Sequence, residues 1–280
     1  MTRRFALAAL AGLATLPRRI AAAATSSVRW TVIYTDKVDP AALLDYTVIV
    51  LDSTHHPPLA PLSGRIVMGY ASLGEVENWR PWFARARDAG IVLDENRNWP
   101  GSFFVDVRSR AWQDIVLDTV VPNVMSQGFG GVFFDTLDNP PHLERTDPKR
   151  YAGMTRAAAS LVEAVRLQYP QARLMLNRGY ELLPLVGGAI DYALGESVYA
   201  DWDFDKKAYR LVEHATYQEQ VRLLQAARRQ FPGLQVMTLD YWDPADRAGL
   251  RRIYRAQRAN GFSPYVATVE LDRLVPEPGR

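Results

Sequence analysis

Eight short runs of β-branched, aromatic and other apolar residues recur along the chain, and the later runs are separated by stretches with helical periodicity. The apolar runs cover residues 30–34, 46–51, 65–71, 131–134, 173–176, 191–194, 234–239 and 265–269. Helical spacing marks residues 111–125, 151–168, 217–231 and 246–260, with a kink expected at Pro122. Strands that alternate with helices form parallel sheets, and eight of them in about 250 residues predict an α/β fold, a closed (β/α)8 TIM-type barrel.

The first third of this barrel should be irregular. The connections at residues 36–45 and 52–64 are too short or too rich in proline to hold full helices. No linker, repeat or low-complexity tract divides the chain, so we expect a single barrel domain over residues 28–280.

Residues 1–27 have the three parts of a secretory signal. Arg3 and Arg4 precede an apolar stretch at residues 5–16, and small residues follow at 21–24. The paired arginines are similar to a twin-arginine signal. An apolar stretch of about 12 residues is too short to span a bilayer. We therefore expect a cleaved signal, export to the periplasm or the extracellular space, and no stable membrane insertion afterwards.

Charge and composition argue against several function classes. The whole chain has 33 basic and 31 acidic residues, but residues 1–27 hold four arginines and no acid, which leaves 29 basic against 31 acidic residues. The basic balance of the full chain therefore does not indicate nucleic-acid binding. The chain has no cysteine, and its four histidines show no ligand spacing, so we expect no metal site and no cofactor. We expect a monomer.

Polar residues end or follow most of the predicted strands. In a TIM-type barrel these ends meet at one mouth, where active sites lie. Some of these acids, such as Asp36 and Asp52, are explained equally well as turn or helix-capping residues. The full set is Asp36, Asp52, Glu75, Asp135 with Asp138, Asn177, Glu196, Asp240 and Glu270.

Asp135 and Glu196 are the candidate catalytic residues. Asp135 ends an apolar strand abruptly, and an unpaired charge there is costly unless it faces a polar cavity. Asp138 suits a helix cap as well as a functional role. Glu196 follows a second apolar run and Gly195, and its alternative role is an ion pair with Arg178. Glycoside hydrolysis needs two carboxyl groups on either side of the scissile bond, which this pair would supply.

Aromatic residues cluster beside the same strand ends. Flat apolar rings stack on the C–H faces of sugars, although any one of these side chains is more often simple packing. The cluster consists of Tyr70, Trp79, Trp82, Tyr199, Trp202, Tyr241 and Trp242.

Four motifs, in order along the chain, resemble those of glycoside hydrolase family 114, the endo-α-1,4-polygalactosaminidase family. They are GYASLGE at residues 69–75, FVDVR at 104–108 with Trp112, GFGGVFFDTLD at 128–138 and GESVY at 195–199. The resemblance implies a barrel that cuts within galactosamine-rich polymers, with Asp135 as the nucleophile and Glu196 as the acid/base. Gly130 stands where the family commonly has an acid, which bears on substrate detail.

The resemblance implies a cationic polysaccharide as partner, because deacetylated galactosamine carries an ammonium group. An acidic mouth would attract it, and the candidate acids are Glu75, Asp135, Asp138, Asp201, Asp203, Asp240 and Glu270. We expect Glu75 and Asp138 to contact the amine and Asn177 to bind a ring hydroxyl. Trp79, Tyr241 and Trp242 are expected to stack on sugar rings. Tyr70, Tyr199, Asp240 and Glu270 complete the predicted substrate-binding set.

Two alternatives remain open on the sequence. One keeps the barrel and the chemistry but takes a neutral or N-acetylated glycan as substrate. The other is a noncatalytic exopolysaccharide-binding barrel, in which Asp135→Asn would leave function intact. The separation of the two carboxyl groups, which decides between retention and inversion, is a property of the structure.

Overall fold

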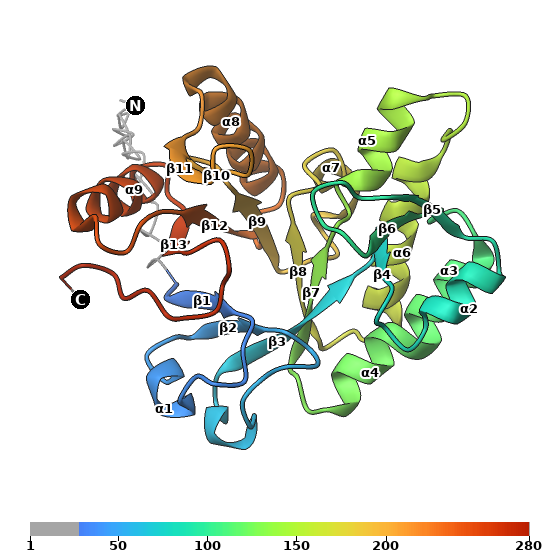
Figure 1. The fold of residues 1–280 in the computed structure, drawn as a ribbon, viewed down its shortest axis with the longest axis horizontal. Helices are drawn as coiled ribbons and strands as arrows, with labels where there is room; N and C mark the ends of the chain where they lie inside the picture. Colours follow the sequence, from blue (N-terminus) through green and yellow to red (C-terminus); the bar gives the residue numbers. More distant parts are fainter. Residues whose placement is uncertain (1–27, 280) are drawn as a thin grey trace, which may run out of the picture.

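The computed structural model describes residues 28–279, so the predicted signal sequence lies outside the described residues. Eight parallel strands form the central sheet in the order β1-β2-β3-β7-β8-β9-β12-β13, as Figure 1 shows. The predicted (β/α)8 barrel is confirmed. The strands are β1 (Trp30–Ile33), β2 (Val48–Leu51), β3 (Ile66–Ser72), β7 (Gly131–Asp135), β8 (Arg173–Asn177), β9 (Tyr192–Glu196), β12 (Gln235–Tyr241) and β13 (Ser263–Ala267).

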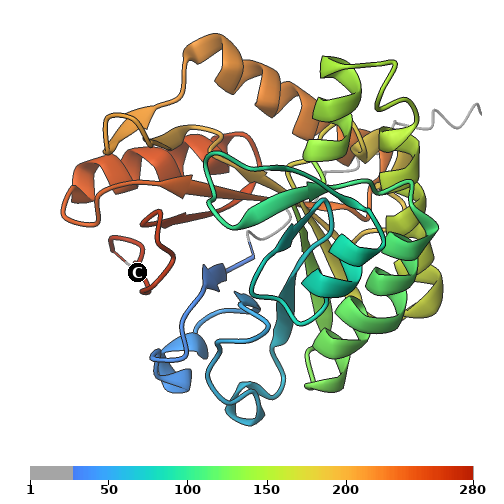
Figure 2. The same cartoon turned by 45° about the vertical axis from the view of Figure 1, so that its right-hand side comes forward.

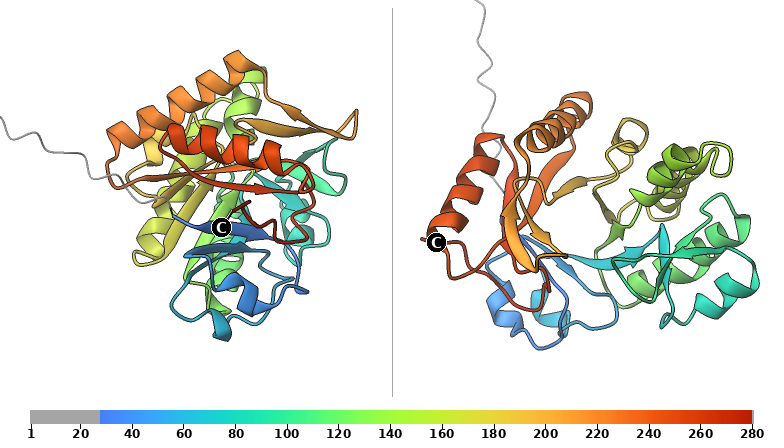
Figure 3. Two further views of the ribbon diagram at one scale, coloured as in Figure 1. Left: turned by 90° about the vertical axis from the view of Figure 1, so that its left-hand side faces the viewer. Right: turned by 45° about the horizontal axis from the view of Figure 1, so that its top comes forward.

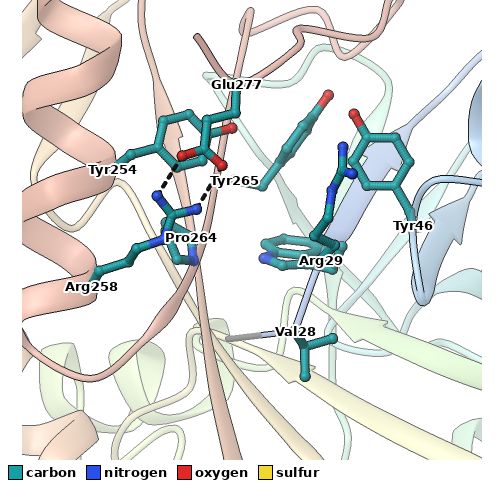
Figure 4. Close-up of a pocket in the computed structure, with 9 residues that line it drawn as sticks. Val28, Arg29, Tyr46, Tyr254, Arg258, Pro264, Tyr265 and Glu277 are labelled. Carbon is teal, nitrogen blue, oxygen red and sulfur yellow. Dashed lines mark hydrogen bonds and ion pairs between the residues drawn. The ribbon is translucent and has the colours of Figure 1, made fainter. Parts of the chain in front are cut away.

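The barrel is nearly closed, because β1 and β13 are joined by individual hydrogen bonds and not by a continuous strand pairing. The indole nitrogen of Trp30 donates to the carbonyl oxygen of Ser263 at 2.8 Å, and the backbone nitrogen of Val28 donates to its hydroxyl at 3.0 Å. The C-terminal tail crosses the same seam, where Arg258 pairs with Glu277 beside a small pocket at the start of these strands (Figure 4). This pocket lies at the end of the barrel opposite to the candidate carboxylates.

Three long helices cover the second half of the barrel: α6 (Met154–Gln168), α8 (His214–Gln230) and α9 (Arg247–Ala259). Helices α8 and α9 lie side by side outside the strands (Figure 3). A carboxylate side chain caps α9, since Asp246 accepts from the backbone nitrogen of Gly249 at 2.8 Å. Among residues 28–279, no helix has the length and apolar character needed to cross a membrane.

The helix predicted at residues 111–125 is interrupted by a π-helical turn. It consists of α3 (Arg110–Ile115), the π-helical η2 (Val116–Val120) and α4 (Val121–Ser126). Pro122 has no N–H with which to continue the α-helical hydrogen bonds, so the preceding turn widens instead. The other helical segments are short: α1 (Pro40–Leu43), the 3-10 turn η1 (Ala60–Leu62), α2 (Phe83–Asp88), α5 (Asn139–Thr146) and α7 (Leu183–Val186).

Two antiparallel insertions, which the sequence patterns did not predict, follow barrel strands. The first, after β3, is a sheet of β4 (Glu75–Glu77), β6 (Ser102–Val105) and β5 (Val92–Glu95), in that order. The second, after β9, is the hairpin of β10 (Ala200–Asp203) and β11 (Ala208–Leu211). The β5–β6 loop reaches across toward this hairpin (Figure 2). Both insertions therefore stand at the mouth of the barrel, where β3 and β9 end.

Candidate active site

Three consecutive strands of the barrel end in a polar residue: Asp135 in β7, Asn177 in β8 and Glu196 in β9. The residue after each of them has a left-handed backbone, with φ of 65° at Thr136, 53° at Arg178 and 52° at Ser197. Residues other than glycine rarely adopt this conformation, which costs about 1 kcal/mol or more each. The chain thus turns sharply three times at one level, just where the polar side chains enter the mouth.

The amide of Asn177 joins the two candidate carboxylates. Its Nδ2 donates to Oδ1 of Asp135 at 2.9 Å and to Oε2 of Glu196 at 2.7 Å. These two oxygens therefore lie no more than about 5.6 Å apart, the sum of the two distances. Asn177 is only 5% exposed, so the barrel fixes the amide and the amide fixes both carboxylates. Asn177 was expected to bind a sugar hydroxyl. The structure shows in addition that its Nδ2 bridges the two acids, while its Oδ1 has no partner among residues 28–279.

Glu196 has a second donor in Tyr241, the last residue of β12. The Tyr241 hydroxyl donates to Oε1 of Glu196, the oxygen that Asn177 leaves free. Burial, and then the charge of Glu196, raise the pKa of Tyr241 well above its ordinary value. The phenol therefore stays protonated and remains a donor, so both oxygens of Glu196 are held by neutral groups.

The carboxyl group of Asp135 has a raised pKa. Burial and the nearby charge of Glu196 raise the pKa of Asp135 to about 7, while the hydrogen bond from Asn177 works in the opposite direction. Asp138 raises it further. Asp135 is therefore protonated in part of the molecules near neutral pH, where an ordinary aspartate is ionised. A site that can hold a proton at neutral pH is what acid-assisted cleavage needs.

Two aromatic residues complete this side of the mouth. Tyr70 of β3 contacts Tyr34, just beyond β1, edge to face with ring centroids 5.5 Å apart. Burial, and then the charge of Asp135, raise the pKa of both phenols well above the ordinary value, so both stay protonated. Tyr70 was predicted here, whereas Tyr34 was missed. Tyr34 could have been found by the feature that identified Tyr70, since it is an aromatic residue at the end of a predicted strand.

Arg80 is a second residue that sequence reasoning missed. Its guanidinium is buried and lies 3.1 Å from Glu77 and 3.8 Å from Asp52. The same group lies 5.9 Å from the centre of the Tyr70 ring. Asp52 therefore has a structural ion-pair role, and Arg80 supports Tyr70 from behind.

Asp138 pairs with Arg178 across the mouth. Oδ2 of Asp138 lies 3.1 Å from Nε of Arg178, and α5 begins at the next residue. Burial raises the pKa of Asp138, and Arg178 opposes this shift. Within residues 28–279, Arg178 thus forms its ion pair with Asp138. From the sequence alone, an ion pair with Arg178 was the alternative role of Glu196.

Glu75 is a structural carboxylate, not an open ligand. Its Oε1 accepts from the amides of Asn96 at 2.8 Å and Asn139 at 2.6 Å, and its Oε2 accepts from the hydroxyl of Ser102. These donors come from the β5–β6 loop, from α5 and from β6. Glu75 therefore ties the first insertion to the loop behind Asp135. Both of its carboxylate oxygens already accept hydrogen bonds within the protein, so neither is left for the expected contact with a substrate amine.

Asp240 has a similar structural role on the other side. It is 0% exposed, and its Oδ1 accepts from the backbone nitrogens of Tyr199 at 2.6 Å and Ala200 at 2.9 Å. Its Oδ2 accepts from the amide of Gln257 at 2.6 Å. Burial raises the pKa of Asp240 to about 6. Asp240 thus holds the start of the β10–β11 hairpin against α9 and does not face the mouth.

The remaining predicted ligands lie outside this arrangement. Trp242 donates to Asp246 at 2.9 Å and packs against α9. Tyr199 contacts Tyr217 edge to face at 5.1 Å. Glu270 is exposed in a turn, because β13 pairs with β12 from Ser263 and ends at Ala267, two residues earlier than predicted. In the described part of the chain, no cluster of three or more His, Cys, Asp or Glu side chains could hold a metal ion.

Two carboxyl groups that face each other at the mouth of a TIM-type barrel are the machinery of a glycoside hydrolase. The comparisons agree with this class. The model of glycoside-hydrolase family GH114 matches residues 14–279, and the chain belongs to that family. The protein is therefore a glycoside hydrolase.

Similar proteins span bacteria and fungi. An uncharacterised protein of Deinococcus radiodurans is 30% identical over 226 residues, which are 77% of this chain and 68% of that protein. The glycoside hydrolase domain of PelA from Pseudomonas aeruginosa is 29% identical with a TM-score of 0.76, covering 88% of this chain and 96% of that one. Ega3 of Aspergillus fumigatus, solved in complex with galactosamine, is 17% identical with a TM-score of 0.65, covering 88% and 93%.

Proposed function

We propose that the protein cuts within α-1,4-linked, galactosamine-rich exopolysaccharide with Asp135 and Glu196 as its catalytic carboxyl groups. The observation that carries the proposal is the Asn177 amide, which donates to both acids and so holds them on either side of one gap. The noncatalytic alternative gives no reason for a costly pair of buried acids to be held this way. Export of the enzyme to such a polymer is part of the same proposal.

The galactosamine substrate is supported by the charge that is left at the mouth. Among residues 28–279, Arg178 pairs with Asp138, and neither Asp135 nor Glu196 forms an ion pair, so the centre of the site attracts an ammonium group. The rim contributes less charge than the sequence indicated, because Arg210 pairs with both Asp201 and Asp203. The solved complex of Ega3 with galactosamine supports the same substrate class by family relationship.

We infer a retaining, double-displacement reaction from the separation of the carboxyl groups. Retaining enzymes hold them about 5–5.5 Å apart, whereas inverting enzymes need about 6.5–9.5 Å to admit a water molecule. The facing oxygens of Asp135 and Glu196 lie no more than about 5.6 Å apart, which is closer than an inverting pair needs. An inverting water would need more room than this bound leaves.

The reaction then follows in two steps. Asp135 attacks the anomeric carbon while Glu196 gives its proton to the departing glycosidic oxygen, which leaves a covalent glycosyl–enzyme. Water next attacks the anomeric carbon and passes a proton to Glu196, and Asp135 leaves as a carboxylate. Two inversions at one carbon give overall retention. These roles are the ones that the family resemblance implies.

The free site holds its proton on the other carboxyl group. Burial favours the protonated form of Asp135, whereas Asn177 and Tyr241 both donate to Glu196. The proposed roles therefore require that the proton moves to Glu196 when substrate enters. A substrate ammonium or a developing positive charge beside Asp135 favours its ionised form and drives this transfer.

The substrate and the catalytic pair are tested together. Purified α-1,4-linked galactosamine polymer, deacetylated or fully acetylated, is incubated with wild type, Asp135→Asn and Glu196→Gln, and the products are sized. We expect internal cleavage of the deacetylated polymer by wild type, and loss of turnover with retained polymer binding in both variants. Preference for the acetylated polymer would favour the neutral-glycan alternative. No cleavage by wild type, with unchanged polymer binding by Asp135→Asn, would favour the noncatalytic one.

Azide rescue separates the two roles. Azide attacks in place of the missing group, so the configuration of the glycosyl azide reports which step lost its residue. We expect Asp135→Gly with azide to give the inverted product in one displacement. Glu196→Ala with azide should give the retained product from the glycosyl–enzyme. The opposite pairing would exchange the roles of the two carboxyl groups.

A further inference from the structure

Three exposed aromatic side chains gather on the two insertions at the mouth. Trp79, Trp99 and Phe204 are 63%, 54% and 47% exposed, and we call them the aromatic strip. Large aromatic rings in water are costly, and a group of them marks a binding surface more often than a single exposed residue does. The other large exposed apolar residues of the described chain are leucines: Leu44, Leu167, Leu185 and Leu211.

The strip joins two insertions that lie far apart in the sequence. Trp99 lies in the β5–β6 loop and Phe204 in the β10–β11 hairpin, and their ring centroids are 5.5 Å apart at an interplanar angle of 79°. The loop that brings Trp99 to this contact is visible in Figure 2. An edge-to-face pair leaves at least one face of each ring uncovered by the other. Trp79 extends the strip, because its ring lies against Gly101, where a Cβ would come within 3.0 Å.

Each half of the strip is anchored behind one candidate catalytic residue. The β5–β6 loop is tied through Asn96 to Glu75, which also accepts from Asn139, four residues after Asp135. The hairpin is tied through Asp201 to the hydroxyl of Ser197, the residue after Glu196, at 2.8 Å. The strip therefore runs from the Asp135 side of the mouth to the Glu196 side.

The β5–β6 loop is built to hold its tryptophan in place. The backbone nitrogen of Trp99 donates to Asn96 at 3.0 Å, and its carbonyl accepts from Ser102 at 3.0 Å. The backbone nitrogen of Gly101 donates to the carboxylate of Glu95 at 2.6 Å. A loop with this many internal bonds presents a fixed ring and loses little entropy when a ligand binds.

We propose that Trp79, Trp99 and Phe204 form a second carbohydrate site, which stacks on pyranose rings of the substrate polymer outside the sugars that flank the cleaved bond. The ligand class rests on the proposed function, because the strip stands at the mouth where that polymer would enter. Apolar ring faces match the C–H faces of sugars. Asp203, the residue before Phe204, is already paired, since it contacts Arg210 at 3.5 Å and Lys206 at 3.8 Å. The strip therefore binds through ring faces, not through charge.

The test compares a long and a short substrate. Initial rates are measured on α-1,4-linked galactosamine polymer and on its tetramer for wild type, Trp99→Leu/Phe204→Leu, Trp99→Phe and the control Leu211→Ala in the same hairpin. We expect the double variant to raise the KM for polymer about tenfold, the size of one aromatic stacking contact, with kcat unchanged. The tetramer should be cut as by wild type, and Trp99→Phe should restore most of the polymer affinity.

Salt gives a second readout. Binding through ring faces is little affected by ionic strength, whereas binding of a cationic polymer to acids weakens as salt screens the charges. The ratio of polymer KM between the double variant and wild type should therefore stay constant from low to high salt. An unchanged polymer KM in the double variant, or an equal loss on polymer and tetramer, would overturn the proposal.

Failure of the proposed function is recognised separately, because it shows in wild type. If wild type cuts the acetylated polymer instead, the same comparison of variants is made on that polymer and its tetramer. If wild type cuts neither polymer, the strip is judged by retardation of the protein in gels that contain each polymer. Equal retardation of wild type and the double variant in both gels would then overturn the strip as a carbohydrate site.

Discussion

Replacing Asn177 by leucine, which has the same branched arrangement of heavy atoms, should move the pH dependence of the enzyme upward. The Asn177 amide donates to both carboxylates and stabilises their ionised forms. A hydrogen bond to a charged group contributes about 1.5–3 kcal/mol, and about 1.4 kcal/mol corresponds to one pKa unit. Loss of the amide should therefore raise the pKa of Asp135 from about 7 to about 8 or 9.

The sign of the effect follows from the active protonation state. The active pair carries one proton, so its loss defines the alkaline limb of the profile of kcat/KM, which reports the free enzyme. Asn177→Leu should move that limb to higher pH by about one to two units. The maximal rate should also fall, by about a hundredfold, because the two acids are no longer held in position.

A matched control separates this effect from general damage to the barrel. Thr238 is fully buried in β12, and its hydroxyl has no partner among residues 28–279. Thr238→Val should keep the wild-type profile and should not lower the melting temperature. An alkaline limb of Asn177→Leu that stays in place, or moves to lower pH, would refute the bridging role of the amide.

Three further predictions follow from the contacts of single residues. Asp240→Asn should raise the free energy of unfolding at pH 8 by about 2–3 kcal/mol, but very little at pH 4. The reason is that the raised pKa of Asp240 makes wild type lose stability as pH rises from 3.8 to about 6. Gln257, whose amide oxygen has no partner in the described chain, can rotate to accept from the new amide. Urea unfolding at the two pH values measures this, and a less stable variant at pH 8 would contradict it. Tyr241→Phe should lower kcat about tenfold to a hundredfold with an unchanged melting curve, because Glu196 loses one charge-assisted donor. A variant with the kcat of wild type would argue against that contact. Glu75→Gln should leave the KM for galactosamine oligomers unchanged, since both carboxylate oxygens are occupied inside the protein, and a raised KM would restore Glu75 as a ligand of the amine.

Much of the barrel, and the positions of the two candidate catalytic carboxylates, could be predicted from local patterns. Strands buried on both faces read as apolar runs, and parallel strands in a barrel bring their ends to one mouth. Asp135 and Glu196 are the last residues of β7 and β9, so a strand-end rule found both. Asp246 and the apolar spacing after it likewise indicated α9.

The rule failed where a strand ended one or two residues from its predicted end. β12 continues to Tyr241, and side chains alternate along a strand, so Tyr241 faces the mouth while Asp240 turns outward to Gln257. Glu270 was assigned to a strand that ends at Ala267. A shift of one residue changes the face of a side chain, and composition does not fix that register.

Other parts depend on contacts between distant segments. The insertion that contains Glu75 has no strong strand pattern, and its carboxylate is occupied by donors from three separate segments. The contact of Trp99 with Phe204 joins two loops whose local sequence predicts only turns. Such pairs are set by tertiary packing, which a single sequence does not display.

The configuration of the first product tests the central claim most directly. Proton NMR can follow the anomeric signals during the first minutes of cleavage of the α-linked polymer, before the free sugar ends equilibrate. Carboxyl groups held as close as the Asn177 bridge requires predict that the α-anomer appears first and the β-anomer later. A β-anomer that appears first would contradict the account, because inversion needs room for water between Asp135 and Glu196.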